Sequence, residues 1–316
     1  MDCCRICDNF LDSKVYNVKE MNFGTREVFQ YQQCVSCGCL QIVEFPRDLG
    51  KYYPSTYYSQ IIKKRYSNNK LLSRIREIRL NAALKHNPAS FILSKPHLPD
   101  WISWVSINSK SKIFDVGSGA GQSLLKLRKK GFLHIEGLDP FIDETVSYPC
   151  GVNVFKKGLS DIAQEPNWQD SFDLVMMHHS LEHIPDQHMS IASAYKILKQ
   201  EGKLLIRIPT CSSWAWEHYR ENWVQLDAPR HLFLHSLQSI ERLANAHGFI
   251  LEQTHFDSSE FQFTGSERYL RNIPLTEKVE AELFSQVDVE TYRQKAIQLN
   301  KDGIGDQAGF VFAKSQ

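Results

Sequence analysis

Four cysteines near the N-terminus have the spacing of metal ligands. Cys4 and Cys7 form one pair with two residues between them, and Cys34 and Cys37 form a second pair, separated from the first by 26 residues. Two residues between thiolates let both sulfurs point at one ion, and two such turns complete a tetrahedral zinc site. Because four sulfurs leave no position for water or substrate, we expect this zinc to be structural.

Two further cysteines flank these pairs. Cys3 and Cys39 lie one and two positions from the expected ligands and are the second choice for the same role. Disulfides or unrelated buried thiols are the alternative for the whole set. The N-terminus has no apolar stretch typical of a secretory signal, so we expect a cytoplasmic protein with reduced thiols. Residues 1–50 are therefore predicted to form a small zinc-binding module, with hairpin strands at 14–19 and 27–33.

A second chemical signal is the sequence Gly-Ser-Gly-Ala-Gly at 117–121, between an apolar run and a helical pattern over 122–130. Glycines at such a turn let backbone amides approach a ligand closely. Asp139 ends the next apolar run, 22 residues after Gly117, where a carboxylate can accept hydrogen bonds from both ribose hydroxyls. A dinucleotide fingerprint would need a glycine where this chain has Gln122, so the loop favours a smaller ligand without phosphates.

Alternating strands and helices are predicted to position this loop. Helical patterns separate successive apolar runs, which lie at 112–116, 134–138, 152–156, 172–177 and 203–208. This alternation implies right-handed crossovers and an α/β fold with a doubly wound, mostly parallel sheet. Such sheets bind ligands beyond the carboxyl ends of their strands, where the strand order reverses. The glycine loop is expected to lie at that edge.

The composition limits the classes of partner. The chain has 316 residues, with Lys+Arg 37 against Asp+Glu 36 and a net charge of +1. There is no basic surplus to attract nucleic acid or an anionic membrane. Hydrophobic residues make up 42% and charged residues 23%, as in ordinary globular proteins. We expect no nucleic-acid partner and no membrane-spanning helix, because no apolar run approaches about 18 residues.

These motifs together resemble the class I S-adenosylmethionine-dependent methyltransferases. The matching segments are residues 115–121, 137–139, 172–175, 181–184, 198–206 and 246–250. The two cysteine pairs and the tyrosine-rich segment that follows are similar to the N-terminal zinc module of sugar C-methyltransferases and their relatives. The resemblance implies a seven-stranded sheet in a methyltransferase domain at 110–316, with an insertion at about 257–306. Residues 51–109 would form a linker and helical lid segment.

The resemblance also implies a set of cofactor-binding residues. These are Asp115, Gly117, Ser118, Gly119, Gly121, Asp139, Leu159 and His178. The glycines and Ser118 would wrap the methionine part of S-adenosylmethionine, and Asp139 would bind its ribose. Leu159 would offer a backbone amide to the adenine, and His178 would lie beside the transferred methyl group.

Methyl transfer requires an aligned acceptor and, when that acceptor is neutral, a base. Histidine suits this step because its pKa lies near the working pH. His179 is the first candidate, and His231, in a loop after the fifth strand, is comparable. Glu182 and His183 are expected to begin the next helix and to cap it. A divalent metal held by His179, Glu182 and His183 is a less favoured alternative.

We expect the acceptor to be a small molecule, such as a nucleotide-linked sugar or a surface-glycan precursor. Arg230 and Arg268 are the candidates for contacting an acidic group of it. The insertion, with Tyr57 and Tyr58, is expected to roof the cleft and exclude water. One alternative is an RNA or protein methyltransferase, which the near-zero net charge disfavours. The other is a non-catalytic zinc-dependent scaffold, against which the intact glycine loop argues.

Overall fold

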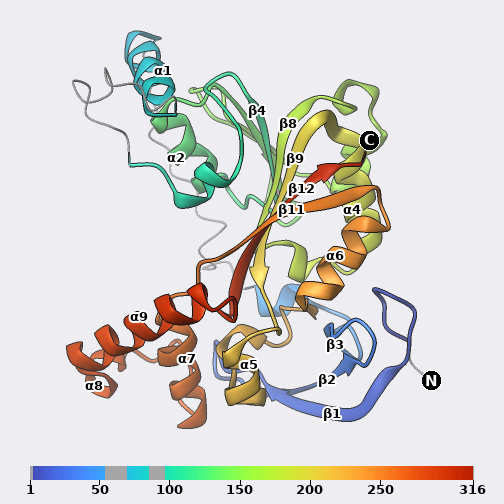
Figure 1. Cartoon of the computed structure of the whole chain (residues 1–316), viewed down its shortest axis with the longest axis vertical. Coiled ribbons are helices and arrows are strands. Elements are labelled where there is room, and N and C mark those ends of the chain that lie inside the picture. Colours follow the sequence, from blue (N-terminus) through green and yellow to red (C-terminus); the bar gives the residue numbers. More distant parts are fainter. Residues whose placement is uncertain (1–2, 54–69, 85–96, 316) are drawn as a thin grey trace.

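The computed structural model describes residues 3–53, 70–84 and 97–315. Within them, an eight-stranded sheet has the order β11-β12-β9-β8-β4-β5-β7-β6 (Figure 1). Its strands are β4 (Lys112–Val116), β5 (His134–Leu138), β6 (Val146–Ser147), β7 (Asn153–Phe155), β8 (Phe172–His178), β9 (Leu198–Pro209), β11 (Phe249–Phe256) and β12 (Gln307–Lys314). The pairs from β7 to β9 are parallel, which confirms the mostly parallel sheet. The count differs from seven because the two-residue β6 adds an antiparallel edge.

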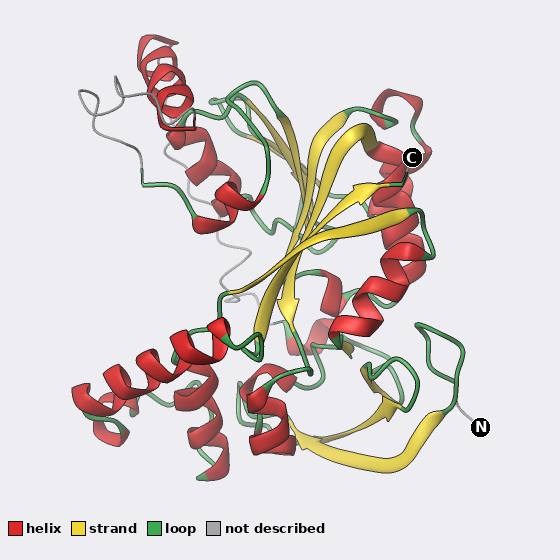
Figure 2. Cartoon of the chain, in the orientation of Figure 1, coloured by secondary structure: helices red, strands yellow, loops and turns green. Residues whose placement is uncertain are grey.

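Helices cover both faces of this sheet (Figure 2). One face carries α1 (Lys70–Leu84) and α2 (Gln122–Lys130), and the other carries α3 (Leu159–Gln164), α4 (Gln187–Ile197) and α6 (Leu237–Asn245). Short 3-10 turns lie at η1 (Gly50–Tyr52), η4 (Asp100–Trp104), η5 (Pro166–Trp168), η6 (Leu181–His183), η7 (Arg220–Asn222) and η8 (Val224–Leu226). No helix in the described part of the chain is long and apolar enough to cross a membrane.

The two faces of the sheet bury separate hydrophobic clusters. Along β8, Leu174 and Met176 belong to the cluster under α1 and α2, whereas Val175 and Met177 belong to the cluster on the other face. Successive side chains of a strand point to opposite faces, so a strand buried on both sides must be continuously apolar. Burial of each such side chain contributes about 1.5–3 kcal/mol. The carboxyl ends of these strands are therefore held rigidly.

The N-terminal module shares a sheet with the rest of the chain. Its strands β1 (Leu11–Lys19), β2 (Val28–Cys34) and β3 (Leu40–Ile42) are joined by β10 (Phe233–Leu234), which pairs antiparallel with β3. The Tyr31 hydroxyl donates to the His231 carbonyl oxygen at 2.8 Å. The module and the main sheet also share one hydrophobic cluster, so the module braces the loop that precedes β10.

The segment between β11 and β12 is helical and lies beside α5 (Trp214–Tyr219) (Figure 1). It contains α7 (Phe261–Leu270), α8 (Glu280–Leu283) and α9 (Gln286–Lys301). Its connecting loop contacts the N-terminal module, where the Leu275 amide donates to the Met21 carbonyl oxygen at 3.1 Å. The insertion therefore packs against the module.

Candidate functional site

A cavity of about 1200 Å³ lies at the carboxyl ends of β4, β5 and β8. Strand β4 has β5 on one side and β8 on the other, so the strand order reverses here. This is the position at which open α/β sheets bind ligands. Seven of the eight predicted cofactor-binding residues line the cavity: Asp115, Gly117, Ser118, Gly119, Asp139, Leu159 and His178.

The glycine loop follows β4 in a conformation that side chains rarely adopt. Gly117 has a φ of +76°, and a Cβ atom there would lie 2.5 Å from the Cβ atom of Ser180. Gly121 has a φ of +77° and precedes α2, but it does not line the cavity. A Cβ atom at Gly121 would lie 2.7 Å from Val154. It turns the chain into the helix, and its contact with the cofactor stays a prediction.

Asp139 is tied to the glycine loop. Its Oδ2 atom accepts a hydrogen bond from the Gly119 amide at 2.9 Å, and its Oδ1 atom accepts one from the Phe141 amide at 2.8 Å. Burial raises the pKa of Asp139, although these two amides oppose the shift. Burial and the charge of Asp139 raise the pKa of Asp115 to about 8. Two carboxyl groups therefore share one cavity wall, with the deeper one neutral near pH 7.

The end of β8 carries His178 and His179. Burial, with the positive charge of Arg207, lowers the pKa of His178 to about 3, so its ring is neutral. His179 has a φ of +50°, and its Nε2 atom lies 2.8 Å from the Arg207 guanidinium, which donates to it. Arg207 in turn pairs with Asp257 at 2.5 Å. The His179 proton is therefore on Nδ1, which lies 3.5 Å from a Glu182 oxygen.

Glu182 is a fully buried carboxylate in η6, not the start of the next helix, which begins at Gln187. Neither carboxylate oxygen accepts a hydrogen bond from any described residue. Burial alone would raise the pKa of Glu182, but the imidazoles of His179, His183 and His231 outweigh it and hold the pKa at about 2. Three rings thus surround one buried negative charge.

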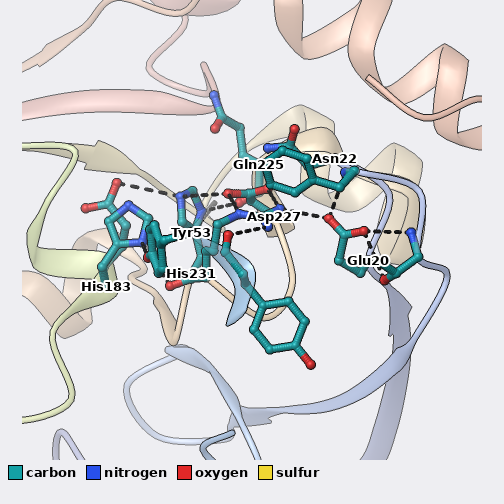
Figure 3. A network of polar contacts seen from close by, with 12 residues as sticks. Glu20, Asn22, Tyr53, His183, Gln225, Asp227 and His231 are labelled. Atoms are coloured by element: carbon teal, nitrogen blue, oxygen red, sulfur yellow. Dashed lines mark hydrogen bonds and ion pairs between the residues drawn. The ribbon is translucent and has the colours of Figure 1, made fainter. Parts of the chain in front are cut away.

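His183 and His231 come from different loops and lie next to each other (Figure 3), and each has a donor atom near Glu182. Their ring centres are 4.7 Å apart. His183 lines the cavity, whereas His231 lies behind the wall. Burial lowers the pKa of His231 to about 4. The predicted base His231 therefore has no direct contact with the cavity among the described residues.

Arg230 holds the loop that carries His231. It is fully buried and pairs with Asp227 at 2.5 Å and with Glu20 of the N-terminal module at 3.1 Å. Figure 3 shows Asp227 and Glu20 in the same polar network. Arg268 is also buried and donates to the Pro274 and Glu277 carbonyl oxygens. The prediction that Arg230 and Arg268 contact an acidic group of the acceptor is wrong, because both are used inside the fold.

Several residues of the cavity were not among the predicted site residues. Tyr53 stacks on Phe141 with ring centres 6.0 Å apart, and its hydroxyl lies 3.0 Å from His183 Nδ1. Trp101 tilts against His178 with ring centres 5.1 Å apart. The described residues that line the cavity include none from the insertion, contrary to its predicted role as a roof. Tyr57 and Tyr58 lie outside the described residues.

The predicted cysteine cluster is assembled in the N-terminal module. Cys4, Cys7, Cys34 and Cys37 bring their sulfurs within 4.8 Å of one another. Cys4 Sγ lies 3.7 Å from Cys37 Sγ, and Cys7 Sγ lies 3.5 Å from Cys34 Sγ. Bonds of about 2.3 Å from zinc to sulfur place tetrahedral sulfurs about 3.8 Å apart, so these distances fit zinc. Cys3 and Cys39 are outside the cluster, and none of the eight cysteines forms a disulfide.

Comparisons with curated proteins find two distant relatives. Phosphoethanolamine N-methyltransferase 2 of Caenorhabditis elegans is 26% identical over 205 residues, which cover 63% of this chain and 44% of that protein. Phosphoethanolamine N-methyltransferase of Plasmodium falciparum is 28% identical over 130 residues, which cover 39% of this chain and 46% of that protein. The chain thus spans less than half the length of these two relatives.

Solved structures show more distant similarity. An S-adenosylmethionine-dependent methyltransferase from Archaeoglobus fulgidus is 18% identical, with a TM-score of 0.41, and the match covers 65% of this chain and 86% of that one. Phosphoethanolamine N-methyltransferase 2 of Haemonchus contortus, in complex with phosphomonomethylethanolamine and S-adenosylhomocysteine, is 19% identical with a TM-score of 0.40. That match covers 68% of this chain and 51% of the other.

A family model described as a methyltransferase domain matches residues 90–254. This range is just over half of the chain, and it includes the glycine loop, Asp139 and the histidines that follow β8. The chain belongs to the methyltransferase-domain family.

Proposed function

We propose that this protein transfers a methyl group from S-adenosylmethionine to a small-molecule acceptor bound in the same cavity. The observation that carries the proposal is the pairing of the glycine loop with Asp139 at the reversal of strand order. The Asp139 carboxylate is held by two backbone amides and faces the cavity, where ribose hydroxyls can donate to it. Membership of the methyltransferase-domain family supports this ligand.

The remaining cofactor contacts are proposed from the residues that line the cavity. Residues 117–119 are proposed to wrap the methionine part of the cofactor, and Leu159, at the start of α3, to contact the adenine. Asp115 lies beside this loop, and a cationic ligand would favour its ionised form. His178 has an Nε2 atom that bonds to no described residue, so it can bond to a ligand near the reacting methyl group.

We propose His179 as the group that takes the acceptor's proton. It lines the cavity, and the buried Glu182 carboxylate faces its Nδ1–H and would stabilise the imidazolium that forms. A bound acceptor would replace Arg207 at Nε2. His231 is proposed as a positioning residue, because it lies behind the wall and contacts the acceptor only through its neighbours. We expect His179→Gln to lower kcat while the affinity for S-adenosylmethionine stays within about twofold.

We propose a nucleotide-linked sugar as the acceptor, because the N-terminal module resembles that of sugar C-methyltransferases. Because Arg230 and Arg268 are engaged in the fold, a diphosphate would be held by the lysines of α2 that line the cavity, among them Lys126 and Lys130. The two curated relatives are named as phosphoethanolamine N-methyltransferases, so a small phosphorylated amine is the second candidate. Both candidates carry phosphate and differ in the atom that receives the methyl group.

The cysteine cluster is proposed to hold one zinc ion with a structural role. Its four sulfurs fill the coordination of the ion, so the ion would link the two turns and take no part in methyl transfer. Backbone amides support the sulfurs: those of Ser36 and Cys37 both donate to Cys34 Sγ at 3.4 Å. Metal analysis of the purified protein should find zinc that cysteine substitution removes.

Two measurements test the proposed function. Calorimetric titration with S-adenosylmethionine should show one site per chain, whereas nicotinamide adenine dinucleotide should show none. Mass spectrometry of reactions with nucleotide-sugars and phosphorylated amines should then detect the gain of one methyl group. Binding of the dinucleotide in preference to S-adenosylmethionine would contradict the proposal.

A further inference from the structure

A second cluster of metal-ligating side chains lies outside the cysteine module. Glu182, His183 and His231 can bring three donor atoms within 4.8 Å of one another, one from each residue. Glu182 and His183 belong to η6 at the end of β8, whereas His231 comes from the loop before β10. Three donor atoms from two separate loops thus lie close together beside the cavity. The question is what holds them there.

The hydrogen bonds of the two rings determine which nitrogen is available. His183 Nδ1 lies 2.9 Å from the Arg230 carbonyl oxygen, and His231 Nδ1 lies 2.7 Å from the Gln225 carbonyl oxygen. A carbonyl oxygen only accepts, so each Nδ1 atom carries the proton. Nε2 is therefore the nitrogen of each ring that can offer a lone pair. A backbone carbonyl that fixes the tautomer in this way is the usual second partner of a metal-binding histidine.

The lone pair of His231 faces oxygen atoms that also lack protons. Its Nε2 atom lies 4.0 Å from a Glu182 oxygen and 3.9 Å from an Asp227 oxygen. Neither Glu182 oxygen accepts a hydrogen bond from a described residue, although the side chain is completely buried. His179 Nδ1 lies 3.5 Å from one of these oxygens, so Glu182 is only weakly paired, and a cation between the carboxylate and the His231 lone pair would stabilise both.

We infer that Glu182, His183 and His231 bind one divalent transition-metal ion. Two imidazoles and one carboxylate form a donor set that zinc, iron and cobalt accept, with at least one position left for another ligand. Donor atoms around a tetrahedral ion lie about 3.4 Å apart, so shifts of under about 1 Å would close the set. The sequence alone suggested His179 in place of His231; the structure instead pairs His179 with Arg207.

This site would differ from the cysteine cluster in place and chemistry. His183 forms part of the cavity wall, so the ion would lie directly behind that wall. The ion would also join η6 to the loop that Arg230 and the N-terminal module hold in place. The inference concerns metal binding alone and does not depend on the proposed methyl transfer.

Cobalt(II) provides the test on the full-length protein with zinc in its cysteine cluster. We expect uptake of one equivalent of cobalt, with an optical spectrum that lacks the charge-transfer bands of sulfur ligands. Glu182→Gln and His231→Asn should each weaken the affinity by more than about 100-fold, beyond the 10–100-fold effect of losing an outer partner. His134→Gln, an exposed histidine at the start of β5, should leave the affinity unchanged.

Anomalous diffraction at the cobalt edge makes the test independent of whether the variants fold. The expected result is a peak bounded by Glu182, His183 and His231 in crystals of the unaltered protein. Either no uptake, or uptake equally strong in all variants with no peak at this position, would overturn the inference. Neither result would bear on S-adenosylmethionine binding, which calorimetry measures separately.

Discussion

The cysteine cluster and the cavity at the sheet edge are built in different ways. The cluster takes four identical donors from two short turns, and its sulfurs face one another in a closed set. The cavity takes its residues from many elements, from Tyr53 in the N-terminal segment to Arg207 in β9, and it is open to a ligand. Damage to the first region should therefore appear mainly as lost stability, and damage to the second as lost binding.

The largest expected effect is on the cluster. Cys34→Ser removes one of the proposed zinc ligands, and structural zinc contributes about 10–16 kcal/mol in small peptides, so we expect Tm to fall by more than about 10 °C. Because β3 pairs with β10, the loss should extend to the loop that carries His231. Thermal unfolding and metal content measure it. Cys3→Ser is the matched control, and an equal Tm for both variants would refute a structural role for the cluster.

In the cavity, Asp139→Ala should abolish binding with little loss of stability. Removing a carboxylate that accepts two ribose hydrogen bonds is expected to weaken S-adenosylmethionine binding by more than about 100-fold, since bonds to charged groups contribute about 1.5–3 kcal/mol each. Calorimetry measures the affinity and thermal unfolding the stability. Asp143→Ala, an exposed neighbour, is the control. Unchanged affinity in Asp139→Ala would show that this carboxylate does not bind the cofactor.

Gly117 and Gly151 have similar backbone conformations, so substitutions at the two positions distinguish the cost of backbone strain from the cost of a steric contact. Gly151 has a φ of +85° with no described atom within 4 Å of an added Cβ, whereas at Gly117 that atom would meet Ser180. We expect Gly151→Ala to cost about 1 kcal/mol of unfolding free energy, and Gly117→Ala to cost about 1–3 kcal/mol more. Chemical denaturation measures both. Ser180→Gly should restore part of the loss in Gly117→Ala, and a lack of rescue would contradict the contact.

A further prediction concerns the pH dependence of the cavity. The pKa of Asp115 is raised to about 8, so its neutral form stabilises the ligand-free fold, and this contribution is lost as the pH rises through 8. A cationic cofactor prefers the ionised form, so affinity should rise by up to about tenfold per unit between pH 6.5 and 8. In Asp115→Asn, both the affinity and Tm should lose this dependence. If the pH dependence persisted in Asp115→Asn, another titrating group would be responsible for it.

The same contrast explains what the sequence could predict. The cysteine pairs, the glycine loop and Asp139 depend on short spacings within a single turn or one βαβ unit, and the structure brings each set together as expected. Helix α2 begins and ends at the predicted residues because glycines bound it at both ends. These features are local, so residue order and spacing are enough to predict them.

Other features depend on how distant loops pack. Nothing near Tyr53 in the sequence indicates that it reaches His183, because the two residues are 130 positions apart. The polarity of Arg230 predicts that it lies exposed in a loop. In the structure it is buried, and the carboxylates of Glu20 and Asp227 neutralise its charge inside the fold. The insertion lies at the expected position in the chain, but its place beside the N-terminal module is decided by tertiary contacts.

The central claim is that the cofactor binds along the glycine loop and Asp139. A crystal structure of the protein grown with S-adenosylhomocysteine tests it most directly. We predict the ribose hydroxyls within hydrogen-bond distance of Asp139, with the amino-acid part against residues 117–119. A ligand bound elsewhere in the molecule, with this edge of the sheet unoccupied, would contradict the account.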